Sequence, residues 1–265
     1  MTIIEAIILG IVQGLTEFLP VSSSGHIELG TVLLGVQSKD NLLFSVVVHC
    51  ATALSTIIIF RKDIATIIQG VFKFQWNEET AYVAKIIVSM IPVGFVGAFF
   101  KDEIETFFGG NVLLVGLMLL LTGTLLAMTF YARKQTGPVT FPKAIIIGIA
   151  QAIAIMPGIS RSGATIATAL LVGVEKERAA RFSFLMVLAP ILGASLLEIM
   201  DYWEAPAVEG SISGLALVLG FLAAFVSGLL ACQWMIAIVK RGKLIYFAIY
   251  CFIIGTLAIA STWFI

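Results

Sequence analysis

Long apolar stretches separated by short polar segments run through the whole chain. Six of them approach or exceed the roughly 20 residues that an α-helix needs to cross a bilayer, and we expect each to be a spanning helix: 42–60, 82–100, 112–131, 182–200, 212–239 and 244–264. Four further apolar segments are mostly shorter, at residues 3–19, 27–36, 144–156 and 164–174. At about 1.5 Å per residue, segment 144–156 extends over only about 20 Å of a hydrocarbon core of about 30 Å. The pattern therefore predicts two re-entrant helical hairpins, although segment 3–19 is nearly long enough for an ordinary short span.

The hairpins are expected to turn where proline and small polar residues interrupt the apolar pattern. Pro20 in the first hairpin and Pro157-Gly158 in the second are each followed by serines and a glycine, a combination that ends one helix and lets the next begin. Non-helical backbone at membrane depth is tolerated only where protein buries it or water fills a cavity. We therefore expect both turns to line one shared site.

The two predicted hairpins are copies of one sequence. Residues 6–25 reappear as residues 144–163 at a constant offset, with Gln13 matching Gln151 and Gly25 matching Gly163. Three of the expected spans follow each copy. A single membrane domain, residues 1–265, is thus predicted to contain two repeats, 1–131 and 144–265.

The loop charges predict how the chain is oriented. Basic residues, which favour the cytoplasmic side, concentrate in four segments: 61–81, 132–143, 175–181 and 240–243. The segments 101–111 and 201–211 are acidic and are expected outside. With both termini outside, the first hairpin enters from the outer face and the second from the cytoplasmic face. The repeats would then be inverted, an arrangement typical of a substrate site near the bilayer midplane.

Composition agrees with a membrane protein. Hydrophobic residues make up 60% of the chain, charged residues only 12%, and the mean hydropathy is +1.07. The expected fold is an all-α integral membrane protein with six spanning helices and two re-entrant hairpins. The net charge is zero, so nothing indicates a nucleic-acid partner. The cysteines lack the paired spacing of a metal or redox site.

The first hairpin carries acid, hydroxyl and imidazole groups close together. Gln13 and Glu17 lie four residues apart on one helix face, where both could reach a common ion or water. The run 22–26, Ser-Ser-Ser-Gly-His, follows at once. A hydroxyl beside an imidazole can supply a nucleophile and a general base. Alternatively, the serines cap the next half-helix and His26 satisfies a backbone carbonyl.

The second hairpin carries an arginine among small residues. Residues 157–165, with Arg161 at their centre, are expected to lead into a helix N-terminus, where free N–H groups and a guanidinium favour phosphate oxygens. The alternative is an internal ion pair between Arg161 and Glu17. A diphosphate suits this site better than a neutral solute does, because its negative charges would be balanced by the positive charges of two helix N-termini, Arg161 and an ion at Glu17.

Other polar positions are weaker candidates. His49 lies within an expected span, where we expect a hydrogen bond between helices. Glycines in the spans are expected to permit close helix packing: Gly94, Gly97, Gly116, Gly123 and Gly228.

The segments 13–17, 19–26 and 157–163 resemble the signature segments of bacterial undecaprenyl-diphosphate phosphatases of the bacitracin-resistance type. The resemblance implies a hydrolase of the bacterial inner membrane that removes the terminal phosphate of undecaprenyl diphosphate, regenerating the lipid carrier of peptidoglycan synthesis. It also implies a site open to the external, periplasmic side and a divalent cation, Mg²⁺ or Ca²⁺. The metal positions would be Glu17 and Gln13, a glutamine that weakens a two-carboxylate site.

The resemblance also implies roles for the other site residues. Ser23 corresponds to the proposed nucleophile, His26 to the family's histidine and Arg161 to its phosphate-binding arginine. We expect the remaining polar and small residues of the two turns to contact the substrate: Ser22, Ser24, Gly25, Ser160, Ser162, Gly163 and Thr165.

Two questions about function stay open from the sequence. Ser23, assisted by His26 or Glu17, would attack phosphorus, with direct attack by activated water as the rival. A transporter or flippase is the second class, because inverted repeats also build transporters. The expected partners are a polyprenyl diphosphate and the bilayer, and a homodimer is compatible with the sequence.

Overall fold

The structure is a computed structural model of the chain. It describes residues 1–35, 41–100, 103–104, 106–107, 111–132, 135–193, 196, 200 and 212–263.

Helices account for the architecture of the described residues, and no strand occurs among them. The elements are α1 (Ile3–Phe18), α2 (Ser23–Leu34), α3 (Asn41–Ile59), α4 (Arg61–Val71), α5 (Glu78–Phe99), α7 (Val112–Met128), η2 (Thr129–Tyr131), α8 (Phe141–Ile153), α9 (Arg161–Leu171), α10 (Lys176–Met186), α12 (Gly214–Arg241) and α13 (Ile245–Ser261). The predicted all-α class is confirmed.

Several helices have the length and composition of membrane spans. Among the described residues, α5, α7 with η2, and α12 are long and apolar enough to cross a bilayer. α3 continues into α4 with a bend of 76°. Joined, the two helices pass the same test of length and composition, either as one broken span or as a re-entrant loop. α13 is apolar but shorter. In the predicted span 182–200, α10 ends at Met186, and residues 194–195 and 197–199 lie outside the described residues.

Two helical segments differ from the prediction. Residues 61–71, predicted as part of a cytoplasmic loop, form α4 after a break at Phe60. α10 begins at Lys176, inside another segment predicted as a loop. Both helices begin with charged residues, which are also common in loops. Hydropathy alone therefore does not distinguish a helix from a loop in these two segments.

Sequence-local signals set the ends of α1 and α2. Thr2 and Glu5 form a capping box at the start of α1, which satisfies N–H groups that a helix start leaves free. α1 ends at Phe18, just before Pro20, and α2 ends at Leu34, capped by Gly35 in the left-handed conformation that glycine adopts readily.

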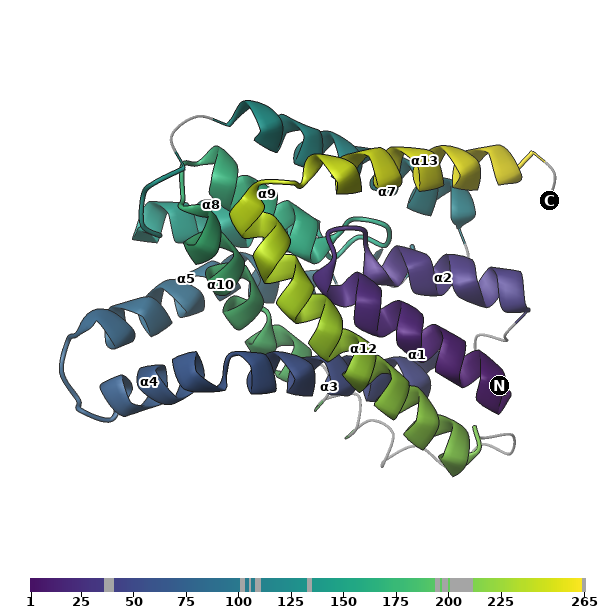
Figure 1. The fold of residues 1–265 in the computed structure, drawn as a ribbon, viewed down its shortest axis with the longest axis horizontal. Coiled ribbons are helices and arrows are strands. Elements are labelled where there is room, and N and C mark those ends of the chain that lie inside the picture. Colours follow the sequence, from purple (N-terminus) through teal and green to yellow (C-terminus); the bar gives the residue numbers. More distant parts are fainter. Residues whose placement is uncertain are drawn as a thin grey trace.

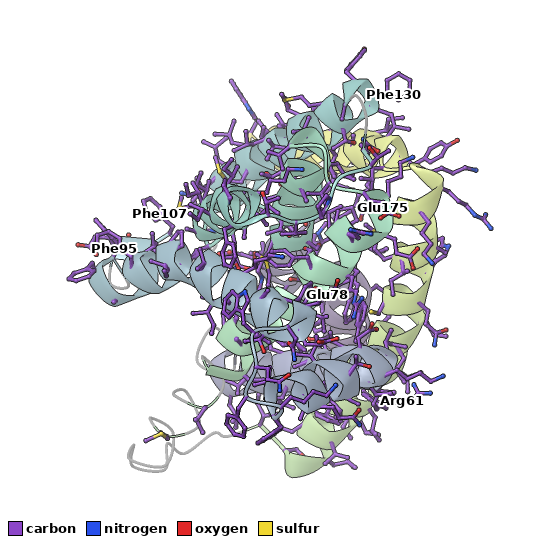
Figure 2. All side chains as sticks on the ribbon, turned by 90° about the vertical axis from the view of Figure 1, so that its left-hand side faces the viewer. Arg61, Glu78, Phe95, Phe107, Phe130 and Glu175 are labelled. Carbon is purple, nitrogen blue, oxygen red and sulfur yellow. The ribbon has the colours of Figure 1, made fainter. Side chains whose placement is uncertain are left out.

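Helices from the two halves of the chain pack against each other (Figure 1). α1 lies along α12, α8 along α5, and α7 along α13. α3 also contacts α12. The turns α1–α2 and α8–α9 are thereby held inside the bundle, while side chains such as Phe95 and Phe130 point away from it (Figure 2).

Glycines allow the closest of these contacts. A Cβ on Gly116 would lie 2.9 Å from the carbonyl oxygen of Gly255, and one on Gly228 would lie 2.9 Å from Ser55 Oγ. A Cβ on Gly123 would likewise lie 3.1 Å from the Ala248 carbonyl oxygen, so the packing prediction is confirmed for these three residues. It is wrong for Gly94 and Gly97, around which a Cβ would meet nothing within 4 Å.

Gly14 offers a test of the α1–α12 contact. A Cβ there would run into the Ala224 carbonyl oxygen and lie 2.8 Å from the Gly228 nitrogen. We expect Gly14→Ala to lower the stability of the protein by about 1–3 kcal/mol, because backbone atoms cannot move aside cheaply. Thermal unfolding in detergent, followed by a thiol-reactive dye that reports exposure of the buried Cys232, measures this.

Gly94→Ala is the matched control for Gly14→Ala. Its Cβ has open space, and alanine favours helix by up to about 1 kcal/mol. Equal melting temperatures for the two variants would contradict the packing described here.

Candidate active site

The first turn is built around a strained serine. Ser22 caps α2: its Oγ accepts the N–H of Gly25 at 3.2 Å and lies 3.3 Å from Ser24 Oγ. Its φ of 71° is unusual for a residue with a side chain, and such strain concentrates at functional sites. The cap leaves Ser23, the first residue of α2, with its hydroxyl free to point elsewhere.

The second turn repeats this arrangement. Ser160 caps α9: its Oγ accepts the N–H of Gly163 at 3.0 Å and lies 3.3 Å from Ser162 Oγ. Ser160 N–H in turn donates to Thr122 Oγ1 at 3.0 Å. Helix capping is thus a role that the structure assigns to both Ser22 and Ser160; it was the predicted alternative for the serines of the first hairpin only. Arg161 occupies the position that Ser23 has in the first copy.

The tips of the two turns touch. Ser162 Oγ donates to the Leu19 carbonyl oxygen at 3.2 Å. A Cβ on Gly25 would lie 3.1 Å from Gly158 Cα, and one on Gly163 would lie 3.3 Å from Pro20 Cβ. The expectation that both turns line one place is confirmed, and glycine at these positions is what permits the approach.

Glu17 joins the two turns chemically. Its Oε2 accepts hydrogen bonds from Ser23 Oγ at 2.6 Å and from Gln13 Nε2 at 2.9 Å. Its Oε1 accepts one from Arg161 Nη2 at 3.1 Å. The side chains from equivalent positions of the two copies, Ser23 and Arg161, therefore meet on the two oxygens of one carboxylate.

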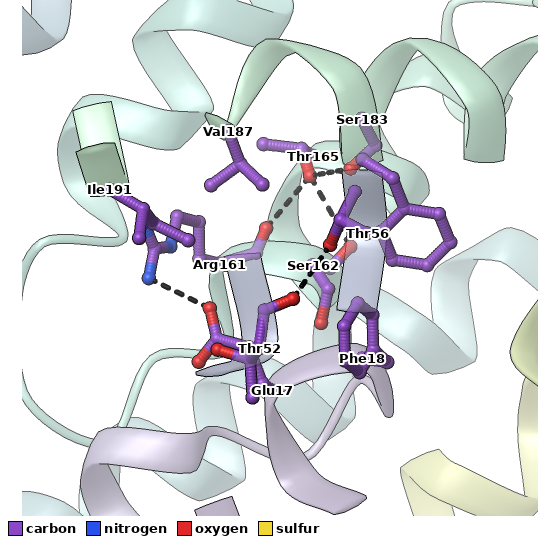
Figure 3. A pocket seen from close by; sticks show the side chains of 11 residues that line it. Glu17, Phe18, Thr52, Thr56, Arg161, Ser162, Thr165, Ser183, Val187 and Ile191 are labelled. Atoms are coloured by element: carbon purple, nitrogen blue, oxygen red, sulfur yellow. Dashed lines mark hydrogen bonds and ion pairs between the residues drawn. The ribbon is translucent and has the colours of Figure 1, made fainter. Parts of the chain in front are cut away.

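The ion pair is not closed off from its surroundings. The Glu17 side chain is 7% exposed, whereas that of Arg161 is 29% exposed. Arg161 and Glu17 line a cavity (Figure 3) whose wall continues in hydroxyls and apolar side chains: Phe18, Thr52, Thr56, Ser162, Thr165, Ser183, Phe184, Val187 and Ile191. An internal ion pair was the alternative prediction for Arg161. The pair does form, yet the guanidinium keeps access to a partly polar cavity.

Thr165 is one turn into α9 and supports its start. Its Oγ1 donates to the Arg161 carbonyl oxygen at 2.8 Å and is hydrogen-bonded to Ser183 of α10. Ser183 and the two threonines of α3 that line the cavity were not among the residues singled out in the sequence. They come from distant segments, and nothing local in the sequence indicates that they meet Arg161.

His26 lies at the rim of the first turn, bonded away from Glu17. Its Nδ1 is 2.8 Å from the Ser22 carbonyl oxygen and its Nε2 is 2.9 Å from the Tyr250 hydroxyl of α13. The two rings stack with centroids 5.6 Å apart. Because a carbonyl only accepts, Nδ1 carries the hydrogen and Nε2 accepts from Tyr250. Both ring nitrogens are thus occupied.

A different histidine approaches the carboxylate. His49 Nε2 of α3 lies 3.9 Å from Glu17 Oε2. Its Nδ1 is 2.8 Å from the Ser45 carbonyl oxygen, within its own helix. Within the described part of the chain, the direct hydrogen bonds of His49 are thus to its own helix, and its approach to the neighbouring helix α1, at 3.9 Å, is too long to be the direct hydrogen bond between helices that was predicted.

The residues around Glu17 suit a hard cation only in part. Among the described residues no group of three or more His, Cys, Asp or Glu side chains could hold a metal. Gln13 Oε1, however, is fully buried and has no hydrogen-bond partner. Amide and carboxylate oxygens are donors that Mg²⁺ and Ca²⁺ prefer, and Mg²⁺ often takes one or two carboxylates together with substrate phosphates. The donor set of Gln13 and Glu17 fits that pattern.

Taken together, the fold and the site define a helical membrane protein with a polar centre where α2 and α9 begin. The chain matches the family described as "Bacitracin resistance protein BacA" over residues 6–257. It is similar to proteins named undecaprenyl-diphosphatase: 57% identical over 259 residues to that of Parabacteroides distasonis (97% of both chains) and 56% identical over 256 residues to that of Bacteroides fragilis (96% of both). The chain belongs to the bacitracin resistance protein family.

Proposed function

We propose that this protein is an undecaprenyl-diphosphate phosphatase that hydrolyses its substrate to undecaprenyl phosphate and inorganic phosphate. The relatives' name supports the substrate and the reaction. One observation supports the proposed chemistry: the Glu17 carboxylate is hydrogen-bonded to both the Ser23 hydroxyl and the Arg161 guanidinium. By recycling the lipid carrier, this reaction would confer bacitracin resistance.

In the proposed reaction Ser23 Oγ attacks the terminal phosphorus. The hydroxyl proton passes to Glu17 Oε2, with which it already shares a hydrogen bond of 2.6 Å. The Oγ–P bond forms as the bond from phosphorus to the bridging oxygen breaks, and undecaprenyl phosphate leaves. Water then hydrolyses the phosphoserine, which releases inorganic phosphate and restores Ser23.

Arg161 and the N-terminus of α9 would stabilise the charge that builds on the transferring phosphoryl group. Phosphoryl transfer depends mainly on positioning and electrostatics. Arg161 has the partly exposed guanidinium needed for this contact, and the backbone N–H groups at a helix start add positive potential. The pairing of His26 with Tyr250 favours Glu17 over His26 as the group that accepts the Ser23 proton.

A divalent cation is part of the proposal. Glu17 and the buried Gln13 Oε1 would hold it together with substrate phosphates. Bound there, it would neutralise phosphate charge and polarise the phosphoryl oxygens.

We expect Gln13→Glu to tighten cation binding about tenfold, the factor that about 1.4 kcal/mol of added attraction gives. The measurement is Mg²⁺ titration by calorimetry, alongside the Mg²⁺ concentration that gives half-maximal phosphate release. Gln69→Glu on the exposed face of α4 is the control and should change neither. Unchanged or weaker Mg²⁺ binding in Gln13→Glu would remove Gln13 from the cation site.

The topology is likewise a proposal: six spanning helices and two re-entrant hairpins, α1–α2 and α8–α9, in two inverted repeats. Its support is the exchange of partners between halves, because α1 packs on α12 as α8 packs on α5, and α7 pairs with α13. The diphosphate would sit at the two tips, open to the external side, with the prenyl tail leaving into lipid. Cross-linking in native membranes tests the homodimer.

The test of function uses purified protein in detergent with a prenyl diphosphate. We expect inorganic phosphate to be released. Movement of the lipid between leaflets of a vesicle without phosphate release would instead assign the protein to the transporter class.

A further inference from the structure

We infer that His49 is a positioning residue of the reaction centre, holding the Glu17 carboxylate toward Ser23, and that His26 instead holds the first turn against α13. This inference rests on the function proposed above. The histidine that positions the carboxylate then comes from α3, outside the two repeated segments 6–25 and 144–163.

The contact between His49 and Glu17 is specific in its atoms. His49 Nε2 lies 3.9 Å from Oε2, the same oxygen that accepts the Ser23 hydroxyl. A neutral ring with its hydrogen on Nδ1 presents a lone pair from Nε2, which would repel the carboxylate directly, so the 3.9 Å approach is favourable when a bridging water donates to both atoms. Through that water the imidazole restrains the oxygen that Ser23 uses.

The imidazole is itself held in place. Its Nδ1 lies 2.8 Å from the Ser45 carbonyl oxygen and 3.3 Å from Ser45 Oγ. A carbonyl only accepts, so Nδ1 carries a hydrogen and Nε2 is the nitrogen turned toward Glu17. A ring oriented by the backbone of its own helix is a typical way to direct the second nitrogen at a functional group.

His49 also belongs to a polar face of α3. Ser45, His49, Thr52 and Thr56 follow one another at spacings of three or four residues and so lie on one side of the helix. Thr52 and Thr56 line the cavity with Glu17 and Arg161. α3 thus turns one consistent side to the site.

The exposure of the side chains agrees with this placement. His49 is 27% exposed and Arg161 is 29% exposed, while Glu17 between them is 7% exposed. Arg161 contacts Oε1 and His49 approaches Oε2. Glu17 is therefore flanked on both oxygens by side chains of two other helices, α9 and α3. His26, whose nitrogens are bonded to Ser22 and Tyr250, makes no such contact.

The test measures kcat and KM for phosphate release in His49→Ala and His49→Gln. Misplacing a catalytic group by about 1 Å can cost about 100-fold in rate, so we expect kcat of His49→Ala to fall about 10- to 100-fold with KM nearly unchanged, because Arg161 still binds phosphate. Glutamine can donate a hydrogen to Glu17 Oε2 and should restore most of kcat. Cys50→Ala, at the next position of α3, is the control and should keep wild-type values.

Three results would overturn the inference: wild-type kcat in His49→Ala, no recovery in His49→Gln, or a loss that appears only in KM. Arg161→Ala, measured in parallel, distinguishes a failure of the role of His49 from a failure of the proposed function. If Arg161→Ala is inactive while His49→Ala is fully active, only the role of His49 fails. If Arg161→Ala and His49→Ala are both fully active, the proposed active site fails together with the role of His49. Thermal unfolding of each variant shows whether a loss of activity comes from misfolding. If His49→Ala misfolds, the kcat of His49→Gln decides whether His49 has the proposed role.

Discussion

Arg161→Ala should reduce phosphate release by about 10³-fold or more while the protein remains folded. Arginines that stabilise the transferring phosphoryl group contribute on this scale in other phosphoryl-transfer enzymes. Here the guanidinium is the cationic side chain bonded to Glu17, and it lines the cavity at the start of α9. The measurement is inorganic phosphate released by purified protein from a prenyl diphosphate, with thermal unfolding recorded on the same sample.

Arg178→Ala is the matched control for Arg161→Ala. Arg178 lies on α10 in an exposed ion pair with Glu175, and exposed pairs contribute little to stability. This variant should keep wild-type activity. Full activity in a folded Arg161→Ala protein would remove the phosphate-binding role assigned to the second turn.

Ser23→Ala should lower kcat by about 10³-fold or more, because removing a nucleophile leaves only the catalysis that binding and electrostatics supply. The Ser23 hydroxyl is held by Glu17 Oε2 at 2.6 Å, so the substitution deletes both the attacking oxygen and the proton that Glu17 would accept. Phosphate release at saturating substrate measures the effect. Acid quenching of wild-type protein with a substrate labelled at the terminal phosphate should also trap label on Ser23.

The water mechanism makes a different prediction for the same variant. If Glu17 activates water directly, Ser23→Ala loses only a hydrogen bond to Glu17, and kcat falls by about tenfold, the factor for about 1.4 kcal/mol. No label would then be trapped. Ser261→Ala, in which the lost hydroxyl bonds only to its own helix at the end of α13, is the control for serine removal.

Much of the site could be predicted from the sequence because the relevant signals are local. Proline followed by serine and glycine ends one helix and caps the next, and this holds at both Ser22 and Ser160. The repeat also predicted that the two turns belong together, since a polar break at membrane depth needs protein or water around it. Gln13, Glu17 and Ser23 are close in the chain, so their mutual bonds follow from one helix and one turn.

The rest depends on how distant helices are rotated and packed, which local patterns do not specify. His49 lies four residues from Ser45, a spacing visible in the sequence, yet only the packing of α3 shows that this face turns to Glu17. Tyr250 pairs with His26 across 224 positions of sequence.

Ser23 and Arg161, from equivalent positions of the two turns, are proposed to act on one phosphoryl group above Glu17. An experimental structure of the protein with orthovanadate, which mimics a phosphoryl group in transfer, tests this arrangement. We expect vanadium bonded to Ser23 Oγ, with Arg161 donating hydrogen bonds to the vanadate oxygens. Vanadate bound elsewhere, or a structure in which the two turns lie on separate surfaces, would contradict it.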